Sequence, residues 1–237
     1  MTNLPNYQLP NVPQKATRFT LMGQSAAAGF GLSGAESIAS SNSAHWRASV
    51  TFHIPHREEA HLAWEAFLAQ MQGAIGTVDV PAKLKWRARD ARGRPISAQP
   101  AILSGLGGDL DTLGLLDHGQ FAAPEAVHVR LQSDASLRDG IIHVEYPDAL
   151  GLRPGQLFSI GGNLHQVRHV IGEGAGVEQV HIRPLLRRDW AAGSALEIAR
   201  PVCRMRLAAD EQGAVDLNFA RMQNIDVQFI EAVEGSS

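Results

Sequence analysis

The chain has 237 residues, of which 44% are hydrophobic and 19% are charged, enough apolar material for a core in one large domain or two small ones. The formal net charge is -3 and the 21 basic residues are scattered, which argues against nucleic acid as the main partner because phosphate binding depends on clustered Lys and Arg. The only cysteine, Cys203, excludes an intrachain disulfide. It lies in the alternating run 202–207, which favours a small buried residue over a catalytic thiolate.

Residues 1–15 form the first distinct segment, in which Pro5, Pro10 and Pro13 stand between polar and single apolar residues. Each proline removes a backbone donor and biases its predecessor towards extended geometry, so we expect an extended N-terminal arm. We expect this arm to be loose in a monomer and to lie across a neighbour in an oligomer. The segment does not have the pattern of a signal peptide, and the chain has no apolar run near the ~18 residues of a membrane span. We therefore expect a soluble protein, made in the cytoplasm and without membrane insertion.

A first domain is predicted over 16–90. It begins with a weakly alternating strand at 17–22, followed by a long loop at 24–43 that is rich in Gly, Ala and Ser. The clearest strand of the chain is 45–54, where apolar and polar residues alternate strictly and β-branched and aromatic residues are frequent. Pro55 ends this strand.

The segment after Pro55 is predicted to be an amphipathic helix, because apolar residues in 60–71 recur at the spacing of one helical face. Glu58 and Glu59 occupy its first turn, where negative charge complements the helix dipole, and Gly73 provides a C-terminal stop. Burial of each large apolar side chain contributes roughly 1.5–3 kcal/mol, so the helix should pack on the preceding sheet. The predicted core of this domain consists of Trp46, Val50, Phe52, Trp64, Phe67 and Leu68.

The remainder of the chain is predicted to be β-rich. A loop-rich insertion is expected at 91–125, where glycines interrupt the pattern, and a second β-meander domain at 126–200. Strands in 202–234 are expected to complete the first domain. The resulting fold class is mainly β with one amphipathic helix (α+β), with a β-sandwich-like first domain and a smaller β-barrel-like second domain. The shorter strands are expected at 75–80, 83–89, 164–171, 177–185, 196–207, 215–219 and 225–233.

A glycine-rich motif, Gly29-x-Gly31-x-x-Gly34, has the spacing of a dinucleotide-binding fingerprint. That chemistry needs a helix whose free N–H groups meet the pyrophosphate. The residues that follow the motif are small and polar and run straight into a strand. We therefore interpret the motif as a flexible loop and expect no bound cofactor.

Ten histidines raise the question of a metal site. His165 and His169 are expected on one strand face but roughly 13 Å apart, too far to chelate one ion together. His181 is a candidate neighbour across the hairpin, although no cysteine or carboxylate completes a set. Asp109 and Asp111 lie in a glycine-rich stretch without the closing Glu of a calcium loop. We expect no metal site and no catalytic set, and hence not an enzyme.

Four tryptophans are candidates for stacking on a sugar ring. Trp46 and Trp64 lie on apolar stripes, which favours a place in the core. Trp86 and Trp190 are less constrained by the pattern. They remain the candidates for contact with a glycan or a partner protein.

Two sets of residues resemble a known family. The first combines the strand that begins at Trp46, Arg57, a helix with an apolar Trp-Phe-Leu face and a closing Gly73-x-x-Gly76-Thr77. These features resemble the N-terminal domain of tail-tip proteins of long-tailed bacteriophages and related tail-like particles. The second half is similar in Arg153-Pro-Gly-Gln-Leu-Phe-Ser-Ile, Leu164-His-Gln-Val, Ile182-Arg-Pro-Leu-Leu and the final alternating strand. One departure is Val78-Asp79-Val80-Pro81, where such proteins often have Gly-Asp-Pro.

The resemblance implies a distal tail protein, a structural subunit of the virion made in the host cytoplasm. Six copies would form a ring that joins the tail tube protein to the central hub and tip proteins. The first domain would build the ring, and the second would lie outside it. The mechanism would be mechanical, with edge strands and the N-terminal arm binding neighbouring subunits.

Three other functions remain open. One is a neighbouring minor tail protein, and another is a carbohydrate-binding module that contacts the host envelope. An exposed Trp86 or Trp190 with polar neighbours would favour the carbohydrate-binding module. A small-molecule enzyme that uses the glycine-rich motif is the third, and stabilisation by nucleotides would favour it.

Overall fold

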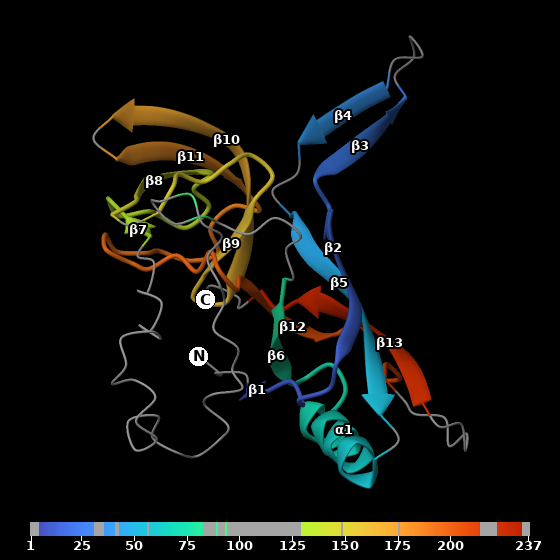
Figure 1. The fold of residues 1–237 in the computed structure, drawn as a ribbon. Helices are drawn as coiled ribbons and strands as arrows, with labels where there is room; N and C mark the ends of the chain where they lie inside the picture. Colours follow the sequence, from blue (N-terminus) through green and yellow to red (C-terminus); the bar gives the residue numbers. More distant parts are fainter. Residues whose placement is uncertain are drawn as a thin grey trace, which may run out of the picture.

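The computed structural model describes residues 5–30, 36–40, 43–55, 57–82, 89, 93, 129–147, 149–174, 176–213 and 222–233. In this part of the chain the fold is mainly β, with two large sheets, a small two-stranded ribbon and one helix (Figure 1). One of the large sheets curls into half a barrel. The predicted fold class is confirmed.

The first sheet has six strands drawn from both ends of the chain. At its centre the last strand, β13, pairs antiparallel with the strictly alternating strand β5, so that Phe52 lies opposite Ile225. On its other side β13 pairs antiparallel with β12. In spatial order the strands are β1 (Asn6–Tyr7), β6 (Thr77–Pro81), β12 (Val202–Leu207), β13 (Met222–Glu231), β5 (His45–Pro55) and β2 (Gln14–Met22).

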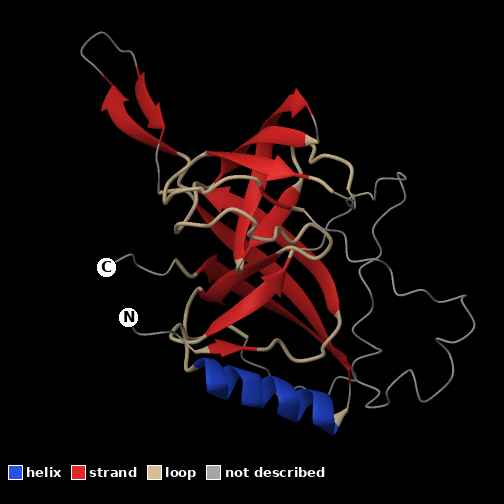
Figure 2. Ribbon diagram, turned by 90° about the vertical axis from the view of Figure 1, so that its left-hand side faces the viewer, coloured by secondary structure: helices blue, strands red, loops and turns tan. Residues whose placement is uncertain are grey.

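Helix α1 (Glu58–Met71) covers the core of the first sheet with Trp64, Phe67 and Met71. The Trp64 ring lies 4.8 Å from that of Phe52, between ring centroids, so the helix face and the strand face share one aromatic cluster. The helix ends at two residues in the left-handed conformation, Gln72 (φ 47°) and Gly73 (φ 67°). Figure 2 shows the helix at the end of the molecule opposite the two-stranded ribbon.

The second sheet has five antiparallel strands from a continuous part of the chain. Its inner face packs around its own hydrophobic core, which includes Phe158, Val180 and Ile182. In spatial order the strands are β7 (Arg130–Leu131), β8 (Ile141–Glu145), β11 (Val177–Arg183), β10 (Asn163–Gly174) and β9 (Leu157–Ile160).

The strand predicted at 196–207 is divided between the two sheets. Residues 195 and 197 form isolated bridges to Arg130 and Ser159, and Leu196 and Ile198 belong to the second core. The first-sheet strand β12 begins only at Val202. Pro201 stands between the two parts, and a proline lacks the N–H that a continuous ladder needs.

The prediction of a loop at 24–43 is wrong for most of this segment. Residues Ser25–Phe30 form β3 and Glu36–Ser40 form β4, which pair antiparallel as a ribbon. Ala, Ser and Gly have weak strand propensity, so the local pattern does not reveal these strands. The flanking strands β2 and β5 pair up to Met22 and His45, and this pairing places the two sides of the ribbon next to each other.

The N-terminal arm also differs from the expectation of a loose segment, because residues 5–13 pack on the chain's own first sheet. Strand β1 pairs in parallel with β6, and the buried Thr77 donates hydrogen bonds to the Pro5 carbonyl from both its N (2.9 Å) and its Oγ1 (3.1 Å). A Cβ on Gly76 would lie 3.0 Å from the Tyr7 ring and 2.9 Å from Met71, so this glycine permits the close approach of the arm.

Several predictions fall outside the described residues. They are the strands at 83–89 (apart from Arg89) and 215–219, the insertion at 91–125 (apart from Gly93), the glycines at 31 and 34, Asp109, Asp111 and Trp86.

Candidate functional site

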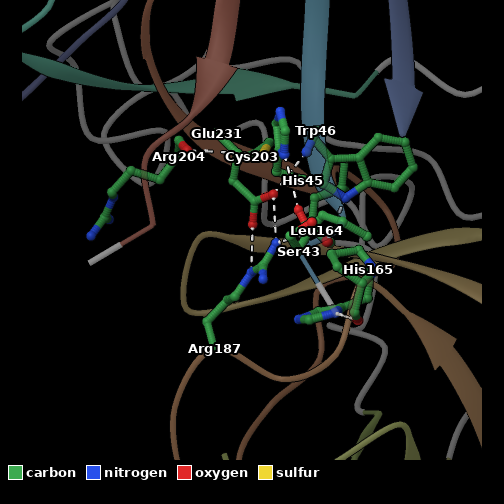
Figure 3. A network of polar contacts seen from close by, with 11 residues as sticks. Ser43, His45, Trp46, Leu164, His165, Arg187, Cys203, Arg204 and Glu231 are labelled. Carbon is green, nitrogen blue, oxygen red and sulfur yellow. Dashed lines mark hydrogen bonds and ion pairs between the residues drawn. The ribbon is translucent and has the colours of Figure 1, made fainter. Parts of the chain in front are cut away.

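A buried ion pair joins the two large sheets (Figure 3). Glu231 ends β13 in the first sheet, and Arg187 follows β11 of the second sheet. The guanidinium contacts both carboxylate oxygens, with Nε 3.0 Å from Oε1 and Nη2 3.0 Å from Oε2. The side chains are only 14% (Arg187) and 2% (Glu231) exposed. A two-bond pair of this kind fixes orientation as well as distance.

Further hydrogen bonds extend this pair to the start of β5. The Trp46 backbone N donates to Glu231 Oε2 (2.8 Å), and Arg187 Nη2 donates to the Ala44 carbonyl. The Trp46 indole Nε1 donates to the Leu164 carbonyl of β10 (2.7 Å). We call Ala44, Trp46, Leu164, Arg187 and Glu231 the junction. Because these bonds satisfy the buried charges, the junction fastens the sheets together without leaving an unpaired ion in the interior.

His165 lies next to the junction and is completely buried. Its Nδ1 is 2.9 Å from the Pro184 carbonyl, which fixes a proton on that nitrogen, and its ring stacks on Phe158 at 5.6 Å between centroids. Burial lowers the pKa of His165 to about 4, and the nearby Arg187 adds to this effect. At neutral pH the imidazole is therefore uncharged.

Cys203 is buried in the first core, as its position in an alternating run predicts. Burial raises the pKa of its thiol well above the usual range. The thiol is therefore protonated at neutral pH, a state that does not suit a nucleophile.

A second contact between the sheets involves Arg204 of β12. Its Nε is 3.0 Å from Asp79 Oδ1, and Asn6 of the arm donates to Asp79 Oδ2 (3.2 Å). The Arg204 backbone N donates to the Gly162 carbonyl in the turn between β9 and β10 (2.7 Å). Residues 78–81, which depart from the pattern of the similar tail-tip proteins, thus belong to strand β6. Asp79 links the N-terminal arm to β12 through its contacts with Asn6 and Arg204.

The six residues predicted as the core of the first domain all lie in or against the first hydrophobic core. Five of them are buried, whereas Leu68 is half-buried at the edge of the cluster. Trp64, the largest of the fully buried side chains among the described residues, also donates from Nε1 to the Gly213 carbonyl (2.9 Å). This bond connects the helix to the turn after β12.

Trp190 is half-buried against the second core. The Arg188 guanidinium carbon lies 3.9 Å from the centroid of its ring, and a Cβ on Gly161 would lie 2.2 Å from Trp190 Cη2. Arg188 therefore covers one face of the ring where a sugar would stack, and the turn at Gly161 lies against the edge of the ring. Trp86, the other predicted contact, lies outside the described residues.

The ribbon formed by β3 and β4 projects away from both large sheets (Figures 1 and 2). It continues directly from β2, which is the edge strand of the first sheet, and the chain bends between them at Gly23 (φ 68°). Within the described residues, β2 pairs with β5 alone, so its outer edge presents backbone donors and acceptors. Such edges are the usual sites at which a strand from another chain adds to a sheet.

Neither a membrane-spanning helix nor a group of three or more metal-binding side chains occurs within the ranges that the structure describes. A scan against protein-family models and a search of curated proteins found no match to this chain. The resemblance to tail-tip proteins therefore rests on the motifs in the sequence.

The junction and the ribbon were not among the sites predicted from the sequence. One signal was available: Ile225, Val227, Phe229 and Glu231 share the alternation of β13, so an acid occupies an inward position. An acid at such a position needs a buried partner. Nothing in the local sequence identifies Arg187 as that partner, because Arg187 lies in the loop after β11 and meets Glu231 only where the two sheets pack together.

Proposed function

We propose that this chain is a structural subunit of a viral tail tip, a distal tail protein that assembles with itself and with partner proteins. The observation that carries the proposal is the ribbon of β3 and β4, which extends from the edge strand of a body whose own elements are tied together internally. The family resemblance provides the identity of the assembly. The role is mechanical rather than catalytic.

The ribbon suits assembly because its strands pair with each other and project beyond the body of the protein. A two-stranded ribbon by itself is marginally stable in water, since it has no sheet or helix to pack on. Contact with a neighbouring subunit would supply that packing. Repetition of this contact around a rotation axis gives a heterologous interface that closes into a ring.

The body suits the same role because its two sheets are fastened at two places, the Arg187–Glu231 pair and the hydrogen bond from the Arg204 backbone N to the Gly162 carbonyl. A ring subunit that connects a tube to a tip transmits force between them. A two-bond charge pair with little exposure, as between Arg187 and Glu231, holds a fixed orientation between the sheets. We therefore assign the six-stranded sheet to the ring and the second sheet to its outside.

In this proposal six copies form the ring, with the tail tube protein on one side and the central hub or tip proteins on the other. The protein is made in the host cytoplasm and incorporated into the virion. No nucleic-acid specificity, cofactor or metal is needed for this assembly role. The half-buried Trp190, covered by Arg188, gives no support to a carbohydrate-binding alternative.

The proposal is tested by the solution mass of the purified full chain and its appearance in negative stain. A hexamer with a central opening is the expected result, alone or on addition of the tail tube protein. A chain that stays monomeric at high concentration, and also in the presence of tube and hub proteins, would contradict the proposal. A ring that binds the hub proteins but not the tube would instead assign the chain to a neighbouring minor tail protein.

A further inference from the structure

Two histidines lie in contact on the outer face of the second sheet. His169 of β10 and His181 of β11 are directly opposite in the antiparallel register. Their ring centroids are 5.8 Å apart, with an angle of 59° between the planes. A register shift between Val167 and His169 separates this pair from the completely buried His165. The expectation that His165 and His169 share a face is therefore wrong, whereas the expected proximity of a histidine to His181 is confirmed.

The spacing of the two rings is close to that of two imidazoles on one metal ion. Zn²⁺ binds imidazole nitrogen at about 2.0–2.1 Å, which places the centroids of two rings roughly 5 Å apart in tetrahedral geometry. The observed distance of 5.8 Å between the ring centroids exceeds this value by roughly 1 Å or less. Because His169 is exposed, rotation of its side chain can close this difference without moving the strands.

One nitrogen of the pair lacks a partner. His181 Nε2 is covered by surrounding atoms and makes no hydrogen bond. A covered polar atom without a partner is unfavourable, and coordination of a metal ion would remove that deficit. On the other side of His181 the register partner is Ile141 of β8, which is 43% exposed and offers no ligand atom.

We propose that His169 and His181 form a site for one divalent transition-metal ion of the class that prefers imidazole, such as Cu²⁺ or Zn²⁺. Two protein nitrogens bind the ion, and water fills the other positions, since the described residues contain no group of three metal-binding side chains. The Irving–Williams order gives Cu²⁺ the higher affinity, and Mg²⁺, which prefers oxygen ligands, should not bind. This site is independent of the proposed assembly role.

The test is a calorimetric titration of the full chain with CuCl₂, ZnCl₂ and MgCl₂ at pH 7.5 in a buffer that does not chelate metals. The expected result is one Cu²⁺ site, weaker binding of Zn²⁺ and no binding of Mg²⁺. Substitution of either ligand, His169→Asn or His181→Asn, should weaken Cu²⁺ binding by at least about tenfold, because one of two protein ligands is lost. The matched control is His61→Asn on helix α1, which should bind Cu²⁺ like the parent.

Electron paramagnetic resonance of the Cu²⁺-loaded chain provides a second readout. The parent should show coupling to two imidazole nitrogens, and each single variant should show coupling to one. Circular dichroism establishes that the variants are folded. Unchanged Cu²⁺ affinity in both ligand variants, or an equal loss of affinity in His61→Asn, would overturn the proposal.

Discussion

The two large sheets differ in how the chain builds them. The first combines strands from both ends of the sequence, so that Val50 pairs with Val227 and Cys203 with Val80. The second is formed within one continuous part of the chain, where β9, β10 and β11 follow one another as hairpins and β8 pairs with β11 from further along the sequence. Non-local pairings require closure of long loops before contacts can stabilise them. The first sheet therefore depends on opposite ends of the chain, whereas the second depends on pairings within residues 130–183.

The junction is where these two modes of construction meet. Leu164 lies on a second-sheet strand yet belongs to the first hydrophobic core, and Arg187 reaches from the second sheet to Glu231 at the end of β13. The two sheets thus share buried side chains rather than only a linker. We therefore expect the free energy of unfolding to fall by different amounts in variants that alter the first core, the shared contact and the surface of the second sheet.

The largest effect is expected from Trp64→Ala in the core of the first sheet. The substitution removes a completely buried ring that contacts Phe52 and Phe67 and a hydrogen bond to Gly213, so it should lower the free energy of unfolding by about 4 kcal/mol. Urea unfolding followed by circular dichroism measures this loss. The control on the same helix is Leu62→Ala, at a side chain that is 60% exposed, which should change stability by less than about 0.5 kcal/mol.

The next effect concerns the shared contact. Glu231→Leu leaves the Arg187 guanidinium buried without its carboxylate and should lower the free energy of unfolding by roughly 3 kcal/mol. The double variant with Arg187→Met removes both charges and should be more stable than the Glu231→Leu single variant. Urea unfolding of the two variants decides this, and equal or additive losses would contradict the interpretation of the contact as a buried pair.

The pH dependence of stability is a third way to examine the junction. His165 has a pKa of about 4 in the folded protein and about 6.5 when unfolded, so the unfolded state binds its proton first as the pH falls. The neutral His165 therefore contributes to the free energy of unfolding in full above pH 6.5. This contribution, about 3 kcal/mol in total, is lost as the pH falls from 6.5 to 4. In His165→Gln this part of the pH dependence should disappear. If the free energy of unfolding depends on pH in the same way in the parent and in His165→Gln, the low pKa of His165 would be excluded as the cause.

The smallest effect is expected at the surface of the second sheet. Arg130 contacts Glu145 on the neighbouring strand through two hydrogen bonds, and its side chain is 51% exposed. The Arg130 hydrogen bond lowers the pKa of Glu145. Arg130→Ala should leave the urea midpoint close to that of the parent, because water and salt screen exposed pairs. A large loss would mean that this edge of the sheet depends on the pair.

The elements with a strict period could be predicted from the sequence. Strand β5 alternates along its length, and helix α1 repeats its apolar residues on one face, so local residues determine both. The ribbon could not be predicted in this way, because its Ala- and Ser-rich strands are specified by the pairing of their neighbours β2 and β5. The N-terminal arm was misjudged for a similar reason, since the contact of Tyr7 with Gly76 is non-local.

The candidate sites divide along the same line. Trp64 and Phe67 follow from the periodicity of one helix, whereas the partnership of Glu231 with Arg187 depends on how two sheets meet. A register shift at Val167 decides which face His169 occupies, and no composition or spacing predicts such a shift.

The central claim is that the ribbon acts outside its own subunit. Replacement of residues 24–42 by Asn-Gly would connect β2 to β5 through a five-residue loop (Gly23, Asn, Gly, Ser43, Ala44), since Met22 and His45 are register partners. Sedimentation velocity of the parent and this variant, each mixed with the tail tube protein, tests the claim most directly. The account predicts a ring-sized particle for the parent and a folded monomer for the variant, with little change in unfolding free energy because the ribbon projects from the body. Assembly of both chains to the same size would contradict it.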